Sequence, residues 1–281
     1  MHSAPQDSMP RLHLRLVCLL LALACCAALP AYGQPTVEDL EDRRPNVAQP
    51  DFTIVNLPTT LRVPRFRSAF RVTHRFNRTL GQGDFGDLAS DFFGLDSGAL
   101  IGLEYRFGLM RGLQVGILRT SDRNIDLFSE YSLLRAGQNA VNVLVSVDGT
   151  DNFRGSYSPT AGLILSRELG TRGALYVEPM WVHNANLLPA DSTADNDTFL
   201  VGLGARLRVR PTVYLVGEFI PRLGYAPGVH HGTFGIEKRS GGHVFQLNFS
   251  NGSGNSPAQL ARGGTGREDW YIGFNISRKF F

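Results

Sequence analysis

One serine near the end of the chain, Ser250, has a setting that could suit a catalytic nucleophile. It ends the stretch GGHVFQLNFSNG (241–252) and is followed by Asn251. A serine hydroxyl attacks an ester only when a base within hydrogen-bond reach accepts its proton. Asn248, two positions earlier, cannot accept that proton, and His243 lies in the other phase of the same strand. The sequence therefore predicts a strand end at a turn and a protein that is not an enzyme.

Residue types that bind metals are present, but their spacing defines no site. Asp191, Asp195 and Asp197 could offer oxygen atoms to Ca²⁺, yet they match no calcium loop, and nothing fixes an acidic residue beside the pair His230-His231. The glycine-rich stretch 251–266 lacks both the Gly-x-x-x-x-Gly-Lys pattern of a phosphate cradle and a following helix. We expect neither a metal nor a cofactor, and we interpret these segments as solvated loops.

Charged side chains occur at alternate positions of several apolar stretches. In Thr198–Arg210, for example, Phe199, Val201 and Leu203 share one phase, while the other phase contains two glycines and three arginines. If the apolar phase faces lipid, the opposite phase lines the interior of a barrel. The residues predicted to face this lumen are Arg67, Arg71, Arg75, Glu104, Arg106, Asp126, Glu130, Glu178, Arg206, Arg208, Glu218 and Glu237.

Two functions would suit such a lining. A pore or binding cavity with a basic wall would favour anionic solutes. Alternatively, the opposite charges pair across a narrow lumen and hold the barrel shut. A barrel of about 12 strands lies between small filled barrels and open 16-stranded porins, which favours a hydrated, mostly closed lumen.

The elements that carry these residues are long alternating strands, most of them of membrane-spanning length rather than the five or six residues of ordinary strands. The sequence predicts an all-β fold, a single antiparallel up-and-down transmembrane β-barrel of about twelve strands. The predicted strands are 65–76, 98–108, 111–119, 124–134, 138–147, 156–168, 173–183, 197–208, 211–221, 231–238, 242–250 and 268–280.

The connections alternate in length, as in outer-membrane barrels with short periplasmic turns and longer outer loops. Most links after odd-numbered strands are long, and those after even-numbered strands are tight. The terminal stretch WYIGFNISRKFF (270–281) alternates like the others, so we expect it to close the barrel against the first strand. Residues 91–95 (DFFGL), in the first long loop, are unusually apolar and would form either a plug in the mouth or a short helix at the membrane interface.

The N-terminal region indicates export. Arg11 and Arg15 precede an apolar run and the small residues before Gln34, which is the pattern of a cleaved signal peptide over 1–33. All three cysteines lie in this segment, and a lipidated Cys25 or Cys26 is the competing interpretation. Residues 34–64 contain five prolines, and we expect an extended or disordered periplasmic leader before a barrel domain over 65–281.

Several motifs together resemble one family. The stretches 241–252 and GFNISR (273–278), with FFGLDSGALIGLEYRFGL and SEYSLLRAG upstream, are similar to an uncharacterised family of bacterial outer-membrane-type β-barrels, catalogued as a domain of unknown function. The resemblance covers about residues 60–281 and implies an outer-membrane barrel with no assigned activity. The region of Ser250 also resembles the nucleophile region of outer-membrane phospholipase A, in which a histidine lies two residues before the serine.

The leading functional prediction is a narrow channel or solute-binding barrel for a small polar or anionic solute in the cell outer membrane. The alternative is a structural barrel that binds another envelope component through its outer loops or leader, and an envelope lipid hydrolase is the least favoured. A formal net charge of +3 gives no case for nucleic acid. The expected partners are outer-membrane lipid, the solute, and the barrel-assembly machinery acting on the C-terminal strand.

Overall fold

A computed structural model describes residues 43–187, 196–226 and 228–281. The predicted signal peptide, the start of the predicted leader, Asp191 and Asp195 lie outside these residues. The described strands are β1 (Ser68–Phe76), β2 (Ala99–Met110), β3 (Leu113–Thr120), β4 (Ile125–Ala136), β5 (Asn139–Gly149), β6 (Tyr157–Glu168), β7 (Gly173–Val182), β8 (Thr198–Arg210), β9 (Val213–Ile220), β10 (Arg222–Leu223), β11 (His231–Ser240), β12 (His243–Ser250) and β13 (Tyr271–Lys279).

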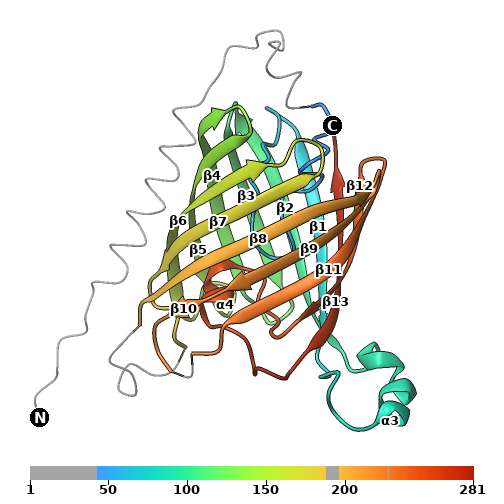
Figure 1. Ribbon diagram of the computed structural model, residues 1–281. Helices are drawn as coiled ribbons and strands as arrows, with labels where there is room; N and C mark the ends of the chain where they lie inside the picture. Colours follow the sequence, from blue (N-terminus) through green and yellow to red (C-terminus); the bar gives the residue numbers. More distant parts are fainter. Residues whose placement is uncertain (1–42, 188–195, 227) are drawn as a thin grey trace, which may run out of the picture. The chain divides into compact units, whose positions relative to one another are not determined.

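These strands form one closed antiparallel barrel (Figure 1). Twelve long strands pair with their neighbours around the ring, and the two-residue β10 adds to one edge of β8. The last strand pairs with the first, with Val72 opposite Ile276, so the barrel has no open edge between its terminal strands. The predicted fold class is therefore confirmed, including the closing role of the C-terminal strand.

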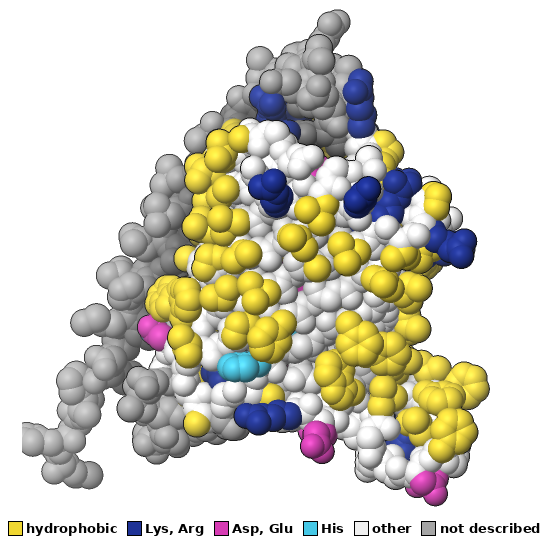
Figure 2. All heavy atoms as spheres, in the orientation of Figure 1, with side chains coloured by type: hydrophobic (Ala, Val, Ile, Leu, Met, Phe, Trp, Pro, Cys, Tyr) yellow, Lys and Arg dark blue, Asp and Glu magenta, His cyan; other side chains and the backbone are white. Residues whose placement is uncertain are grey.

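The barrel is apolar outside and polar inside, as expected for a wall between lipid and a lumen. Along β8, Phe199, Leu203 and Leu207 are exposed on the outer face, whereas Arg206 on the inner face is fully buried. Apolar side chains cover much of the wall in Figure 2. This arrangement reverses that of a soluble protein, and it follows directly from the alternation in the sequence.

The two ends of the barrel differ. At one end, which we call the turn end, tight turns join β2 to β3, β4 to β5, β6 to β7, β8 to β9 and β11 to β12. At the other, the loop end, longer connections include 77–98, 183–197 and 251–270. β1 starts at the turn end, because Ser68 pairs with Phe107 near the β2–β3 turn. The predicted alternation of short and long links is thus present.

The first loop contains α3 (Phe85–Ser90) and the 3₁₀ turn η1 (Phe92–Gly94). Asp84 caps α3 through a hydrogen bond from the Asp87 amide, which sets the start of the helix. Phe85 and Phe92 are exposed, and α3 projects away from the strands in Figure 1. The prediction that 91–95 forms a plug is therefore wrong, because these side chains do not enter the lumen. No helix in the described parts of the chain is long and apolar enough to cross a membrane.

Residues 46–63 fold back inside the barrel, and we call them the inner segment. Ile54, Val55 and Leu57 are completely buried, as are Thr59 and Thr60. The sequence predicts an extended or disordered leader for these residues, outside the folded body, and the structure differs. The difference arises because polar lumen side chains bond the backbone of the inner segment, so a proline-containing stretch needs no periodic pattern to be ordered there.

Candidate functional site

The tip of the inner segment is a tight turn. The Ile54 amide donates to the Leu57 carbonyl at 2.8 Å, and the Thr59 amide donates to the Phe52 carbonyl at 2.8 Å. A single bridge between Thr53 and Pro58 completes this small hairpin. The turn leaves three successive amides, those of residues 55–57, without partners inside the segment.

The carboxylate of Glu218, on β9, satisfies these three amides. Its Oε1 accepts from the amides of Val55 at 2.7 Å, Asn56 at 2.8 Å and Leu57 at 2.8 Å. Converging amides form a concave anion-binding arrangement, here occupied by a carboxylate of the wall. Because hydrogen bonds to a charged acceptor are stronger than neutral ones, Glu218 is a strong anchor of the tip.

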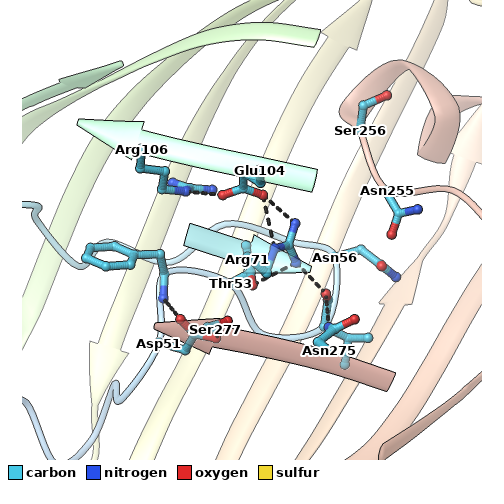
Figure 3. A network of polar contacts seen from close by, with 12 residues as sticks. Asp51, Thr53, Asn56, Arg71, Glu104, Arg106, Asn255, Ser256, Asn275 and Ser277 are labelled. Atoms are coloured by element: carbon cyan, nitrogen blue, oxygen red, sulfur yellow. Dashed lines mark hydrogen bonds and ion pairs between the residues drawn. The ribbon is translucent and has the colours of Figure 1, made fainter. Parts of the chain in front are cut away.

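A chain of charges runs along the inner face of the wall on β1, β2 and β4, and Figure 3 shows its members Arg71, Glu104 and Arg106. Arg71 pairs with Glu104 at 2.5 Å, Glu104 also pairs with Arg106, and Arg106 reaches Glu130 at 3.3 Å. Arg71 Nη1 donates to Thr53 Oγ1 at 2.9 Å and to the Val55 carbonyl at 3.0 Å. The chain therefore pairs opposite charges of the wall and binds the inner segment at the same time.

Two fully buried arginines hold the other side of the tip. Arg75 Nη2 donates to Asn56 Oδ1 at 2.7 Å. Arg206, on β8, pairs with Glu237 on β11 at 2.9 Å, and its Nη2 also donates to the Thr53 carbonyl at 2.6 Å. An ion pair removed from water needs such additional hydrogen bonds to offset its desolvation.

Nearer the turn end, further hydrogen bonds continue the attachment. Thr60 Oγ1 lies 2.5 Å from Ser166 Oγ on β6, and Ser277 on β13 donates to Asp51 Oδ2 at 2.6 Å. Gln114 Oε1 accepts from the Val63 amide at 3.1 Å. The inner segment is thus bonded to strands on several sides of the lumen along most of its length.

Two glycines of β8 make room for the inner segment. A Cβ atom at Gly204 would lie 2.2 Å from Ile54 Cδ1, and one at Gly202 would lie 2.8 Å from the Leu57 methyl groups. Such separations are too short for real side chains, so the wall is hollowed where the apolar tip packs. The glycines that fill the inner phase of 198–210 therefore have a packing role.

At the loop end, a different segment fills the lumen. The β12–β13 loop enters the barrel with α4 (Pro257–Ala261), whose residues Ala258–Ala261 are buried. Ser256 caps this helix and donates to Asp148 Oδ2 on β5 at 2.7 Å. Leu260 belongs to the same buried apolar cluster as Ile54 and Leu57. The lumen is accordingly filled from both ends.

The structure brings most of the predicted lumen residues together and leaves two aside. Arg67 is exposed before β1, and Arg208 is half-buried at the turn end, where it donates to the Pro211 carbonyl at 3.1 Å. Ten are buried on the inner face: Arg71, Arg75, Glu104, Arg106, Asp126, Glu130, Glu178, Arg206, Glu218 and Glu237. The alternation of apolar and polar residues could not predict which residues of the inner segment contact this set, because the inner segment belongs to no strand.

Ser250 does contact a histidine. Its Oγ lies 3.2 Å from Nε2 of His231 on β11, so the predicted absence of a nucleophile–base contact is wrong; the base comes from the neighbouring strand. The arrangement still lacks a third group, because no hydrogen-bond partner of His231 Nδ1 is found in the described structure. Both side chains are completely buried, and Ser250 also bonds the Gly252 carbonyl at 2.5 Å. These contacts tie the loop to the wall.

Fold and lumen together define a membrane-bound β-barrel of the outer-membrane type with a filled polar interior. Residues 51–280 match the family described as membrane bound beta barrel domain, DUF5777, and the chain belongs to that family. The chain matches none of the curated proteins with which it was compared.

Three solved outer-membrane structures are similar to this barrel. NanC porin has a TM-score of 0.52 at 6% identity, covering 75% of this chain and 99% of its own. KdgM porin has a TM-score of 0.48 at 7% identity, covering 76% and 99%. The COG4313 outer membrane channel of Pseudomonas putida F1 has a TM-score of 0.46 at 11% identity, covering 78% and 97%. At such identities the likeness shows the fold alone.

Proposed function

We propose that this protein is a gated outer-membrane channel for small polar solutes, and that the filled barrel is its closed state. The observation that carries the proposal is that the closing element is separate from the wall. The inner segment joins β1 through residues 64–67, and it holds to the lumen through packing of its apolar tip and, along most of its length, through polar contacts. Water or a polar solute can replace contacts of this kind, so the segment can leave without breaking the strand ladder.

The charges of the lumen refine the class of solute. The ten buried wall residues comprise four arginines and six carboxyl residues, so this set alone gives no anion preference. A vestibule of about 170 Å³ at the turn end is instead lined by Arg43, Arg44, Arg239 and Lys279. A basic vestibule concentrates anions at that mouth. We therefore assign any preference for anionic solutes to the vestibule.

Planar-bilayer recording with deletion variants tests the proposal. Because the lumen is filled from both ends, we expect little conductance from the intact mature protein. A variant lacking both 46–60 and 253–262 should conduct in steps, and each single deletion should conduct less often. A double-deletion variant that still shows the heat-dependent gel shift of a folded barrel, yet never conducts, would overturn the channel.

The dense pairing of wall charges also supports a second candidate, a barrel that stays shut and serves as an interaction platform. Arg71, Glu104 and Arg106 pair within the wall itself. In this case the exposed Phe85 and Phe92 of the first loop would contact another envelope component. No variant would then conduct, and a partner would co-purify with the intact protein but not with a variant lacking 83–96. In either case the alternating strand β13 is the segment that we expect the barrel-assembly machinery to bind.

A further inference from the structure

The outer face of the barrel has a groove over β9, β11, β12 and β13. It is a shallow, open groove of about 490 Å³, and the apolar side chains that line it are Val213, Ile236, Phe245, Leu247, Phe274 and Ile276. Phe245 stands opposite Ile276, and Leu247 stands opposite Phe274, so the groove follows paired side chains across the strands. A groove within a lipid-facing wall is filled by hydrocarbon in a membrane.

Basic side chains collect at the turn end of this groove. Lys238 lines the groove itself and stands opposite both Val213 and Phe245. Arg210, on β8, also stands opposite Val213 of β9. Arg210 and Lys238 therefore lie on either side of Val213. Arg278 on β13 is the outer-face neighbour that follows Ile276; its Nη1 lies 2.8 Å from His243 Nε2, and its guanidinium lies over the Phe280 ring. All three cationic side chains are exposed.

Among the described residues, the carboxylate next to this cluster in the sequence, that of Glu237, is completely buried and pairs with Arg206 inside the lumen. The segments 65–69, 109–114, 134–140, 166–174, 208–214, 238–244 and 277–281, which form the turn end, hold twelve Lys or Arg and one acidic residue, Glu168. Glu168 is on β6, and its Oε1 accepts from Asn46 and Gln49. Figure 2 shows dark blue side chains gathered toward the turn end, above much of the apolar surface.

We propose that this groove is a binding site for one anionic phospholipid of the leaflet at the turn end. An acyl chain lies along the six apolar side chains, and the headgroup phosphate is bound by Arg210, Lys238 and Arg278. Long basic side chains at the edge of a hydrocarbon layer extend their charged ends to the headgroups, and each contributes to attraction for anionic lipid. The site is independent of whether the lumen opens.

Native mass spectrometry of the detergent-purified barrel, mixed with phosphatidylglycerol or phosphatidylcholine of equal chain length, tests this proposal. The intact protein should retain one phosphatidylglycerol in preference to phosphatidylcholine. Lys238→Gln should weaken that retention about fivefold, the effect of losing one cation near a headgroup. The triple variant Arg210→Gln, Lys238→Gln, Arg278→Gln should lose the preference.

Two further variants separate the site from general electrostatics. Arg167→Gln removes an exposed cation at the same end of β6, away from the groove, and should leave retention unchanged. Val213→Trp fills the groove while keeping every charge, and it should lower retention of both lipids. Equal retention of the two lipids by the intact protein, or equal losses in Arg167→Gln and Lys238→Gln, would overturn the site. Displacement of the lipid by inorganic phosphate at matched ionic strength would show that the basic cluster binds soluble anions, and this result would also refute the proposal.

Discussion

The carboxylate of Glu218 holds the backbone of the inner segment through three amides at 2.7 to 2.8 Å. Another buried wall carboxylate, that of Glu178 on β7, has no hydrogen-bond partner for either oxygen among the described residues. The two residues are similarly buried and share a charge type, but differ in their contact with the inner segment. They therefore form a matched pair for testing what holds the tip.

Replacing Glu218 by Gln should loosen the tip. The amide oxygen of Gln can still accept hydrogen bonds, but these lose the charge assistance that makes them roughly twice as strong. We expect hydrogen exchange at the amides of residues 55–57 to become about tenfold faster, equivalent to roughly 1.4 kcal/mol. Mass spectrometry of deuterium uptake in a folded, reconstituted barrel measures this. Glu178→Gln is the control, and equal acceleration in both variants would show that Glu218 is not the anchor.

The glycines of β8 allow a second test at the same scale. Even a Cβ atom at Gly204 would lie 2.2 Å from Ile54 Cδ1, so we expect the ring of Gly204→Phe to expel the tip from its site. The cost of overpacking a filled site is about 1–3 kcal/mol. A cysteine placed at the buried Val55 should then react with a membrane-impermeant maleimide at least about tenfold faster. Ala205→Phe, which adds the same ring to the outer face, should leave the labelling rate unchanged.

Individual contacts in the lumen were the least predictable part of the site. Alternation placed Ser250 and His243 in opposite phases of β12, and this remains true. It could not show that β11 sets Thr233 opposite Ser250, which brings His231 near the serine hydroxyl. The sequence contains strand phases, but the register between strands depends on turn geometry and on the packing of the closed barrel.

At the scale of elements, the strands were predictable and the inner segment was not. A strand in a two-faced wall carries a period of two, and each observed long strand lies within a few residues of its predicted range. Residues 46–63 are surrounded by polar wall groups, and side chains from every direction satisfy their backbone. Such surroundings impose no regular alternation of apolar and polar residues. The composition of the inner segment alone therefore suggested disorder.

A disulfide between the inner segment and β6 should lock the closed state. Thr60 Oγ1 and Ser166 Oγ lie 2.5 Å apart, so cysteines at both positions bring their sulfur atoms within bonding reach. No cysteine follows Cys26 in the sequence, so the engineered pair would have no competing thiol in the mature barrel. In a background lacking 253–262, we expect channel openings in the oxidised Thr60→Cys, Ser166→Cys protein to fall at least about tenfold and to return with a reductant.

The two single-cysteine variants are the controls for this experiment. Each should conduct like the parent protein whether or not reductant is present. Openings that continue at the parent frequency in the fully oxidised double variant would mean that solute passes without movement of the inner segment at Thr60, and the gating role of that segment would fail.

At the scale of the whole molecule, membrane location rests on which face of the wall is apolar. The sequence predicted this correctly because the lipid-facing and lumen-facing phases differ so strongly in polarity. Because the outer face meets lipid, a charge placed on it destabilises the barrel by an amount that depends on its depth in the membrane. A basic residue costs about 2–4 kcal/mol of stability near the midplane and about 0–1 kcal/mol near either interface.

β8 offers both depths on one strand. Leu203 is in its middle and Val209 is one residue from its turn end, and both face outward. Leu203→Arg should therefore lower the free energy of unfolding in bilayers by about 2–4 kcal/mol, whereas Val209→Arg should lower it by about 1 kcal/mol or less. Denaturant titration of the reconstituted protein measures both changes. In a barrel whose apolar face met protein or water, the two substitutions would show no such dependence on depth, so equal losses would contradict the membrane orientation on which the channel and the lipid site both depend.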